Sequence, residues 1–209
     1  MYLEKIELKN FKNYESENIN FSDKINFITG ENGSGKTNLL DAIYYLSFTK
    51  SAFNKIDENN IKNDTNFFSI RGNYKVDKKS ISIDCKYKKN EKKIILFNDS
   101  PYEKISLHLG KIPAIIIAPN DSDLIRNSSY YRRRFFDLII SQIEQDYLQG
   151  IIKYNKIIKS RNLVLQKFKK KKYVDTNEIE HYDDLLIKLN HYIRNKRSEY
   201  LIEFKKKFF

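Results

Sequence analysis

Near its N-terminus the chain carries the octapeptide Gly30-Glu31-Asn32-Gly33-Ser34-Gly35-Lys36-Thr37. It matches the phosphate-binding pattern G-x-x-x-x-G-K-[ST]. Glycines allow backbone angles that wrap N–H groups around phosphate oxygens, and the start of a following helix adds partial positive charge. In such a loop Lys36 bridges the β- and γ-phosphates, and the Thr37 hydroxyl binds Mg²⁺. We therefore predict that residues 30–37 bind a nucleoside triphosphate, most simply ATP, together with Mg²⁺.

The segments on either side of this loop have the periodicities that the pattern requires. Lys24–Thr29 is a compact run that stops at Gly30 and predicts a strand. In Lys36–Phe48 the apolar residues recur at helical spacing. This strand–loop–helix context favours a true phosphate loop over an accidental glycine-rich turn.

Further strands are expected in the first part of the chain, where apolar and polar residues alternate. Three runs after the loop are separated by polar segments short enough for hairpin turns, which predicts an antiparallel sheet beside the strand of the phosphate loop. A continuous apolar run predicts a strand that is buried on both faces. In chain order these segments are Tyr2–Leu8, Phe67–Val76, Ser80–Tyr87, Lys92–Phe97 and Ile112–Ala118.

The second part of the chain has helical periodicity to its end. We place the change at residue 119, which predicts an ATP-binding lobe over residues 1–119 and a helical lobe over residues 120–209. Two heptad-like patterns predict a helical hairpin. Its tip is basic, with Lys169, Lys170, Lys171 and Lys172, followed by Asp175 as the expected N-cap of the second helix.

Composition points to a polyanionic partner. The formal net charge is +12 and the pI is about 9.5, and a basic surface attracts nucleic acid, although abundant lysine also serves solubility alone. Cys85 is the single cysteine, so no internal disulfide forms and a reducing compartment fits. The N-terminus does not have the pattern of a signal peptide, and the longest apolar run is too short to span a bilayer. A cytoplasmic protein with no membrane partner is expected.

A phosphate loop does not by itself distinguish a kinase, a GTPase and an ATP-driven clamp. Small-molecule kinases and GTPases tend to build a parallel sheet through helical crossovers. This chain places alternating strands directly before and after the loop, which favours an α/β head of the ABC-ATPase type with mixed and antiparallel strands.

Three segments together resemble the RecF family in order and spacing: Leu8–Tyr14, the loop with Asn38–Leu46, and Ser128–Asp137. The resemblance implies an ABC-type ATPase related to SMC and Rad50 heads, which dimerises around ATP and acts in DNA replication, recombinational repair and the SOS response. It implies single-stranded or gapped DNA, RecR and possibly RecO as partners. It also implies that Lys12 and Asn13 contact ATP; an exposed turn is the alternative.

The sequence also departs from the family pattern. A signature loop of Leu-Ser-x-Gly-Gln type and an apolar strand ending in a magnesium-binding carboxylate are both missing. Ile83-Asp84, Phe136-Asp137 and Ile202-Glu203 are poor substitutes because of their surroundings. We therefore expect a fragment or a truncated product with little ATPase activity by itself.

Tyr130–Phe136 mixes three arginines with aromatic rings, which suits contact with phosphates and stacking on unpaired bases. Arg132 is the candidate for DNA contact, together with the four lysines of the hairpin tip. The structural alternative is that Phe135 faces the core and that Arg133 or Arg134 is buried against Asp137; for the lysines it is a solvated helix end.

Two hypotheses compete with an ATP-gated DNA-binding protein. A kinase or GTPase would transfer phosphoryl groups without a partner. A degenerate remnant would bind DNA through its lysines without using ATP.

Overall fold

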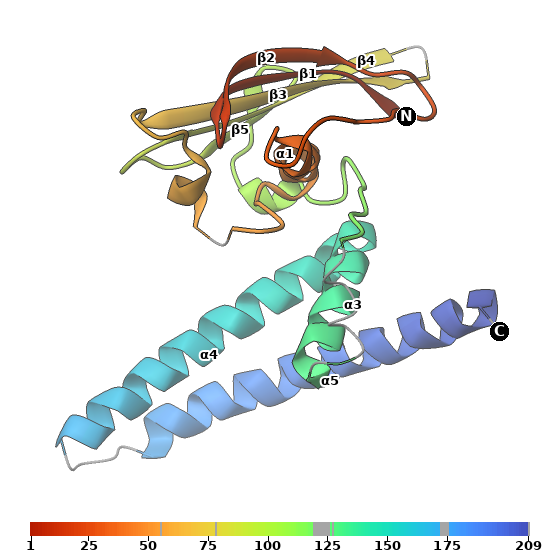
Figure 1. Ribbon diagram of the computed structural model, residues 1–209. Coiled ribbons are helices and arrows are strands. Elements are labelled where there is room, and N and C mark those ends of the chain that lie inside the picture. Colours follow the sequence, from red (N-terminus) through yellow and green to blue (C-terminus); the bar gives the residue numbers. More distant parts are fainter. Residues whose placement is uncertain (55, 78, 119–125, 127, 172–175, 209) are drawn as a thin grey trace. The chain divides into compact units, whose positions relative to one another are not determined.

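The computed structural model describes residues 1–54, 56–77, 79–118, 126, 128–171 and 176–208. The chain divides into two compact units, Met1–Ile117 and Ala118–Phe209 (Figure 1). The division of the sequence into functional lobes at residue 119 stays a prediction.

Six strands in the described part of the first unit form one sheet in the order β2-β1-β3-β4-β5-β6, with antiparallel pairing throughout. The three alternating runs after the phosphate loop are strands, so that prediction is confirmed. The bounds are β1 Tyr2–Phe11, β2 Tyr14–Asn20, β3 Phe67–Val76, β4 Lys79–Lys88, β5 Ile94–Phe97 and β6 Ser100–Pro101.

Helix α1, Lys36–Phe48, packs against one face of this sheet (Figure 1). The helix is confirmed as predicted. The close approach of helix and sheet depends on Gly72 of β3, since a Cβ atom there would lie 2.5 Å from Cδ1 of Leu46. The core between them contains the buried side chains of Ile6, Phe11, Leu39, Ala42, Tyr45, Leu46, Phe68, Ile70 and Ile83.

A polar network connects the C-terminal half of α1 to the segments around Asp57 and Lys93. The hydroxyl of buried Tyr45 donates a hydrogen bond to Asp57 Oδ1 at 2.7 Å, and Lys93 Nζ lies 2.8 Å from Asp57 Oδ2. Asp57 belongs to the 3-10 turn η1, Asp57–Asn60, and a second such turn, η2, spans Ile105–Leu107. Tyr45, Asp57 and Lys93 therefore all have hydrogen-bond partners, as is usual for polar groups that are removed from water.

Two of the predicted strands are wrong. Lys24–Thr29 and Ile112–Ala118 form no regular strand in the structure. Ile112 is buried, but the exposed fractions are 73% for Ile25, 88% for Phe27, 84% for Ile115 and 86% for Ile117. A strand needs a neighbour that satisfies its N–H and C=O groups. Within the described residues neither segment pairs with a strand of the sheet, so both lie outside it.

The second unit consists of helices. They are α3, Ser129–Ile143, α4, Gln145–Lys171, and α5, Thr176–Phe208. α4 and α5 run in opposite directions as the predicted hairpin, and α3 packs against both (Figure 1). Lys172 and Asp175 lie outside the described residues. None of the helices described here is long and apolar enough to cross a membrane.

The prediction that Asp137 pairs with Arg133 or Arg134 is wrong. Its carboxylate binds Arg197 of α5, with Nε and Nη2 of the guanidinium 2.7 and 2.8 Å from the two carboxylate oxygens. Arg133 instead donates to Ser129 on the exposed side of its own helix. Phe135 is also not a core residue, since 36% of it is exposed, whereas Phe136 packs into the helical core. The sequence could not identify a partner so distant along the chain.

Candidate nucleotide-binding site

The backbone of the phosphate loop has the conformation that its glycines predict. Gly30, Gly33 and Gly35 have positive φ angles of 147°, 86° and 108°. Gly35 is the N-cap of α1, and no side chain caps that helix end. The N–H groups of the first helical turn have no acceptor within the helix, so they are available to an anion.

Lys36 lies at the start of α1, where the sequence predicts a phosphate ligand. Its Nζ donates hydrogen bonds to the carbonyl oxygens of Gly30 and Glu31, both at 2.7 Å. The ammonium group is thus held across the mouth of the loop by neutral acceptors. A phosphate would be a stronger acceptor because it is charged. The exposed Thr37 follows in the first turn, so the residues present fit a phosphate group with its magnesium ion.

The turn between β1 and β2 lies against the outer side of the loop. Asn13 Nδ2 donates to the carbonyl oxygen of Ser34 at 3.3 Å and Asn13 Oδ1 accepts from Asn38 Nδ2 at 2.8 Å. The Tyr14 hydroxyl donates to the carbonyl oxygen of Gly35 at 3.1 Å. The structure therefore brings Asn13 to the loop; contact of Asn13 with ATP stays a prediction.

Lys12 is held by a carboxylate that the sequence analysis did not single out. Lys12 Nζ lies 2.6 Å from Asp41 Oδ2, and Asp41 is fully buried in α1. Ser51 Oγ and the Ala52 N–H also donate to this carboxylate, at 2.6 and 2.7 Å. The signal was present in the sequence, because Asp41 interrupts the apolar, core-facing side of a helix, where an unpaired carboxylate would be costly.

The three poor substitutes for a magnesium-binding carboxylate all have basic partners. Asp84 lies 3.4 Å from Arg71, Asp137 binds Arg197, and Glu203 lies 3.0 Å from Lys206. Among the described residues no group of three or more His, Cys, Asp and Glu side chains has a metal-binding arrangement. Thr37 thus remains the protein group predicted to bind magnesium.

The candidate DNA-binding residues belong to the second unit. Arg132 lies on α3 and Lys169 near the end of α4, and both are exposed. Lys170 and Lys171 are the last residues of α4, and Lys172 lies outside the described residues. Their contact with DNA stays a prediction.

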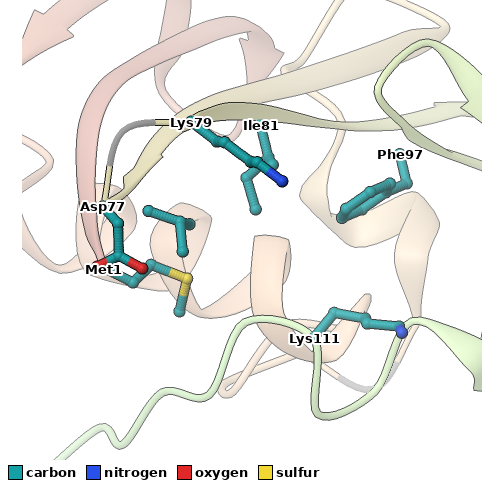
Figure 2. Close-up of a pocket in the computed structure, with 7 residues that line it drawn as sticks. Met1, Asp77, Lys79, Ile81, Phe97 and Lys111 are labelled. Atoms are coloured by element: carbon teal, nitrogen blue, oxygen red, sulfur yellow. The ribbon is translucent and has the colours of Figure 1, made fainter.

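A depression of about 660 Å³ opens beside the β3–β4 turn (Figure 2). Its wall is mostly apolar, with the side chains of Ile81 and Phe97 on one side and Lys111 on another. No residue of the phosphate loop lines it, so its size does not make it the nucleotide site. The remaining lining residues are Met1, Val76, Asp77 and Lys79.

Comparison with known proteins agrees with this geometry. The family model described as AAA ATPase domain matches residues 1–209. A DNA replication and repair protein RecF from Cytophaga hutchinsonii is 44% identical over 201 residues, which are 96% of this chain and 53% of that protein. A solved structure of the recombination mediator protein RecF with ATP, in the RecFOR pathway, superimposes with a TM-score of 0.91 and 30% identity. It covers 98% of this chain and 55% of that one.

A structure described as an SMC ATPase has the same fold at 23% identity. Its TM-score is 0.55, over 66% of this chain and 99% of that one. The predicted fold class and the resemblance to RecF are therefore confirmed, while the chain spans about half the length of the RecF proteins that it matches. The chain belongs to the AAA ATPase domain family and is homologous, over nearly its whole length, to the N-terminal half of RecF.

Proposed function

We propose that this chain binds Mg-ATP through residues 30–37 and forms the nucleotide-binding part of a RecF-type protein. The observation that carries the proposal is the loop itself. Three glycines with positive φ lead into the start of α1, and Lys36 lies across the opening. The name of the RecF structure with ATP supports the choice of ATP.

The residues of the loop have distinct roles in this proposal. The N–H groups at the start of α1 donate to phosphate oxygens, and Lys36 exchanges two carbonyl oxygens for the phosphates. Thr37 holds the magnesium ion, which neutralises phosphate charge when it is bound. Glu31, Asn32 and Ser34 supply backbone to the cradle.

Hydrolysis is a separate matter. The sequence contains no signature loop, and Asp84, Asp137 and Glu203 each have a basic side chain nearby. We propose that this chain by itself hydrolyses ATP slowly, and that a second head and further residues complete the catalytic site in an ATP-dependent homodimer. A kinase or GTPase would instead show phosphoryl transfer by the chain alone.

The biological role is proposed from the family. RecF relatives are named for DNA replication and repair, and the RecF structure is assigned to the RecFOR pathway. We propose recombinational repair and SOS induction in the cytoplasm, with RecR and RecO as partners. Single-stranded or gapped DNA is the proposed substrate, bound through Arg132 and the lysines at 169–172. The formal charge of +12 supports an anionic polymer as partner.

The experiment is a measurement of DNA affinity with and without Mg-ATP, for the wild-type chain and for Lys36→Ala. Nucleotide binding is measured in parallel with a fluorescent ATP analogue. We expect Lys36→Ala to weaken ATP binding at least tenfold, because a charge-assisted contact is lost. We also expect ATP to tighten DNA binding in the wild type only.

Two results would count against the proposal. If wild type and Lys36→Ala bind ATP equally, the loop is not the nucleotide site. If DNA affinity falls with salt but is the same with and without Mg-ATP, the chain is a remnant whose DNA binding does not depend on nucleotide.

A further inference from the structure

We infer that Asp41 is a positioning residue of the nucleotide site, acting through the β1–β2 turn, which braces the phosphate loop from outside. The brace consists of Lys12, Asn13 and Tyr14. This inference rests on the proposed binding of ATP by residues 30–37, and it adds residues that the phosphate-loop pattern does not contain.

The brace acts on the peptide groups that donate to phosphate. In a trans peptide the carbonyl oxygen and the next N–H point in opposite directions. Asn13 holds the carbonyl oxygen of Ser34, so it orients the N–H of Gly35. Tyr14 holds the carbonyl oxygen of Gly35, so it orients the N–H of Lys36. Both N–H groups belong to the loop-to-helix junction, where the phosphates are expected.

Gly35 shows how closely the turn approaches the loop. A Cβ atom at this position would lie 2.6 Å from Asn13 Nδ2 and 3.0 Å from the Tyr14 hydroxyl oxygen. Gly33, in contrast, has nothing within 4 Å of such an atom. The turn therefore touches the loop at its junction with α1 and leaves the other side of the loop open for a ligand.

Asp41 fixes the turn to the same helix that begins at the loop. Its carboxylate is completely buried, and only 11% of the Lys12 side chain is exposed. Lys12 has a φ angle of 53°, a left-handed conformation that a lysine adopts only when its surroundings hold it there. The ammonium group also lies 5.5 Å from the centre of the Phe53 ring and 5.7 Å from that of Phe11. These contacts hold Lys12 in place beneath Asn13 and Tyr14.

Direct contact of Lys12 with phosphate is the competing interpretation, and the two differ in their predictions. If Lys12 binds phosphate itself, Asp41 competes for its charge, and Asp41→Asn leaves ATP affinity unchanged or raises it. If Asp41 positions the brace, Asp41→Asn weakens ATP binding, since a loop with unfixed N–H groups loses preorganisation.

The test compares Asp41→Asn, Lys12→Met, the double variant and Tyr14→Phe with the wild type. Lys89→Ala is the matched control, because it removes an exposed ion pair with Glu58 on the surface. Affinity is measured for ATP and for inorganic triphosphate, at a temperature at which every variant is folded. We expect Asp41→Asn, Lys12→Met and Tyr14→Phe each to weaken the binding of both ligands about threefold to tenfold, as loss of one oriented hydrogen bond implies, and Lys89→Ala to leave both affinities unchanged. The double variant should lose no more than Asp41→Asn alone.

The outcomes separate the inference from the proposed function. If the wild type binds ATP and both Asp41→Asn and Tyr14→Phe bind it with the same affinity, the inference about the brace is overturned and the proposed function stands. Lower thermal stability with unchanged affinity also overturns it, because the contacts are then structural only. No ATP binding by the wild type removes both. If Asp41→Asn does not fold, Tyr14→Phe and Asn13→Ala decide by the same criterion.

Discussion

Two glycines of the phosphate loop differ in what surrounds them. Gly33 and Gly35 both have positive φ angles, but only Gly35 has side chains within reach of an added Cβ atom. The difference allows backbone strain and steric conflict to be measured separately.

We predict that Gly33→Ala lowers the free energy of unfolding by about 1–2 kcal/mol, the cost of a left-handed backbone for an L residue. Gly35→Ala should cost about 1 kcal/mol more, because its methyl group also breaks the Asn13 hydrogen bond. Urea denaturation of both variants measures the difference. Equal losses would show that the turn can move away from the loop without cost.

His108 is a second residue with a measurable effect. It is fully buried, and its Nε2 lies 2.6 Å from the carbonyl oxygen of Leu46, to which it donates. Burial lowers the pKa of His108 below its ordinary value of about 6.5. In the pH range between the lowered pKa and 6.5, the unfolded chain binds more protons than the folded chain, so this group favours unfolding as pH falls.

We therefore predict that the stabilisation by neutral His108 is fully present above about pH 6.5 and is lost as pH falls through its folded pKa. The slope is at most about 1.4 kcal/mol per pH unit for one proton. His108→Gln removes the titrating group but can still donate to Leu46. Urea titrations from pH 7.5 to about 5 should show a steeper decline for the wild type than for this variant; parallel curves would disprove the prediction.

At the scale of elements, the sheet and α1 share a packed core, whereas residues 24–29 form no strand and leave Ile25 and Phe27 largely exposed. Phe68 of β3 is fully buried between sheet and helix, while 88% of Phe27 is exposed. Both are apolar residues in segments that the sequence predicts as strands. Among the described residues, only the segment of Phe68 pairs with neighbouring strands.

We predict that Phe68→Ala lowers the free energy of unfolding by about 3–5 kcal/mol, because a buried ring leaves a cavity. Phe27→Ala should change it by less than about 0.5 kcal/mol, since little area is buried there. Thermal or urea unfolding followed by circular dichroism measures both. A large effect of Phe27→Ala would mean that residues 24–29 are packed in solution.

The whole molecule is basic, and its lysine cluster at 169–172 lies in the second unit, whereas the phosphate loop lies in the first. If these lysines bind DNA phosphates, each releases counterions and contributes about 0.7–0.9 to the slope of log K against log salt. Replacement of all four by serine should make the slope shallower by about 3 to 4 if every one of them contacts a phosphate. Filter binding over a salt series measures it, with Lys88 and Lys89 replaced as a control; an unchanged slope would indicate a solvated helix end.

Much of this architecture could be predicted from local patterns. α1, β3 and β4 carry their periodicity within their own residues, and the phosphate loop is identified by spacing alone. The exceptions depend on distant partners. Lys24–Thr29 has strand periodicity but no neighbouring strand within the described residues, and Asp137 binds an arginine 60 residues away. Asp41 is an intermediate case, because the sequence shows a carboxylate on the core-facing side of a helix but does not show that Lys12 of another element is its partner.

The turns of this chain make little use of glycine. Left-handed positions in the turns that join β3 to β6 are taken by Asp77, Asn90, Asn98 and Asp99, residue types that tolerate such angles, whereas the β1–β2 turn uses Lys12. The whole chain has six glycines, and three of them are in the phosphate loop. Two of the six glycines mark close packing, since an added methyl group at Gly35 or Gly72 would meet a neighbouring side chain. In a chain with so few glycines, a glycine at such a position indicates that another part of the molecule comes close to the backbone there.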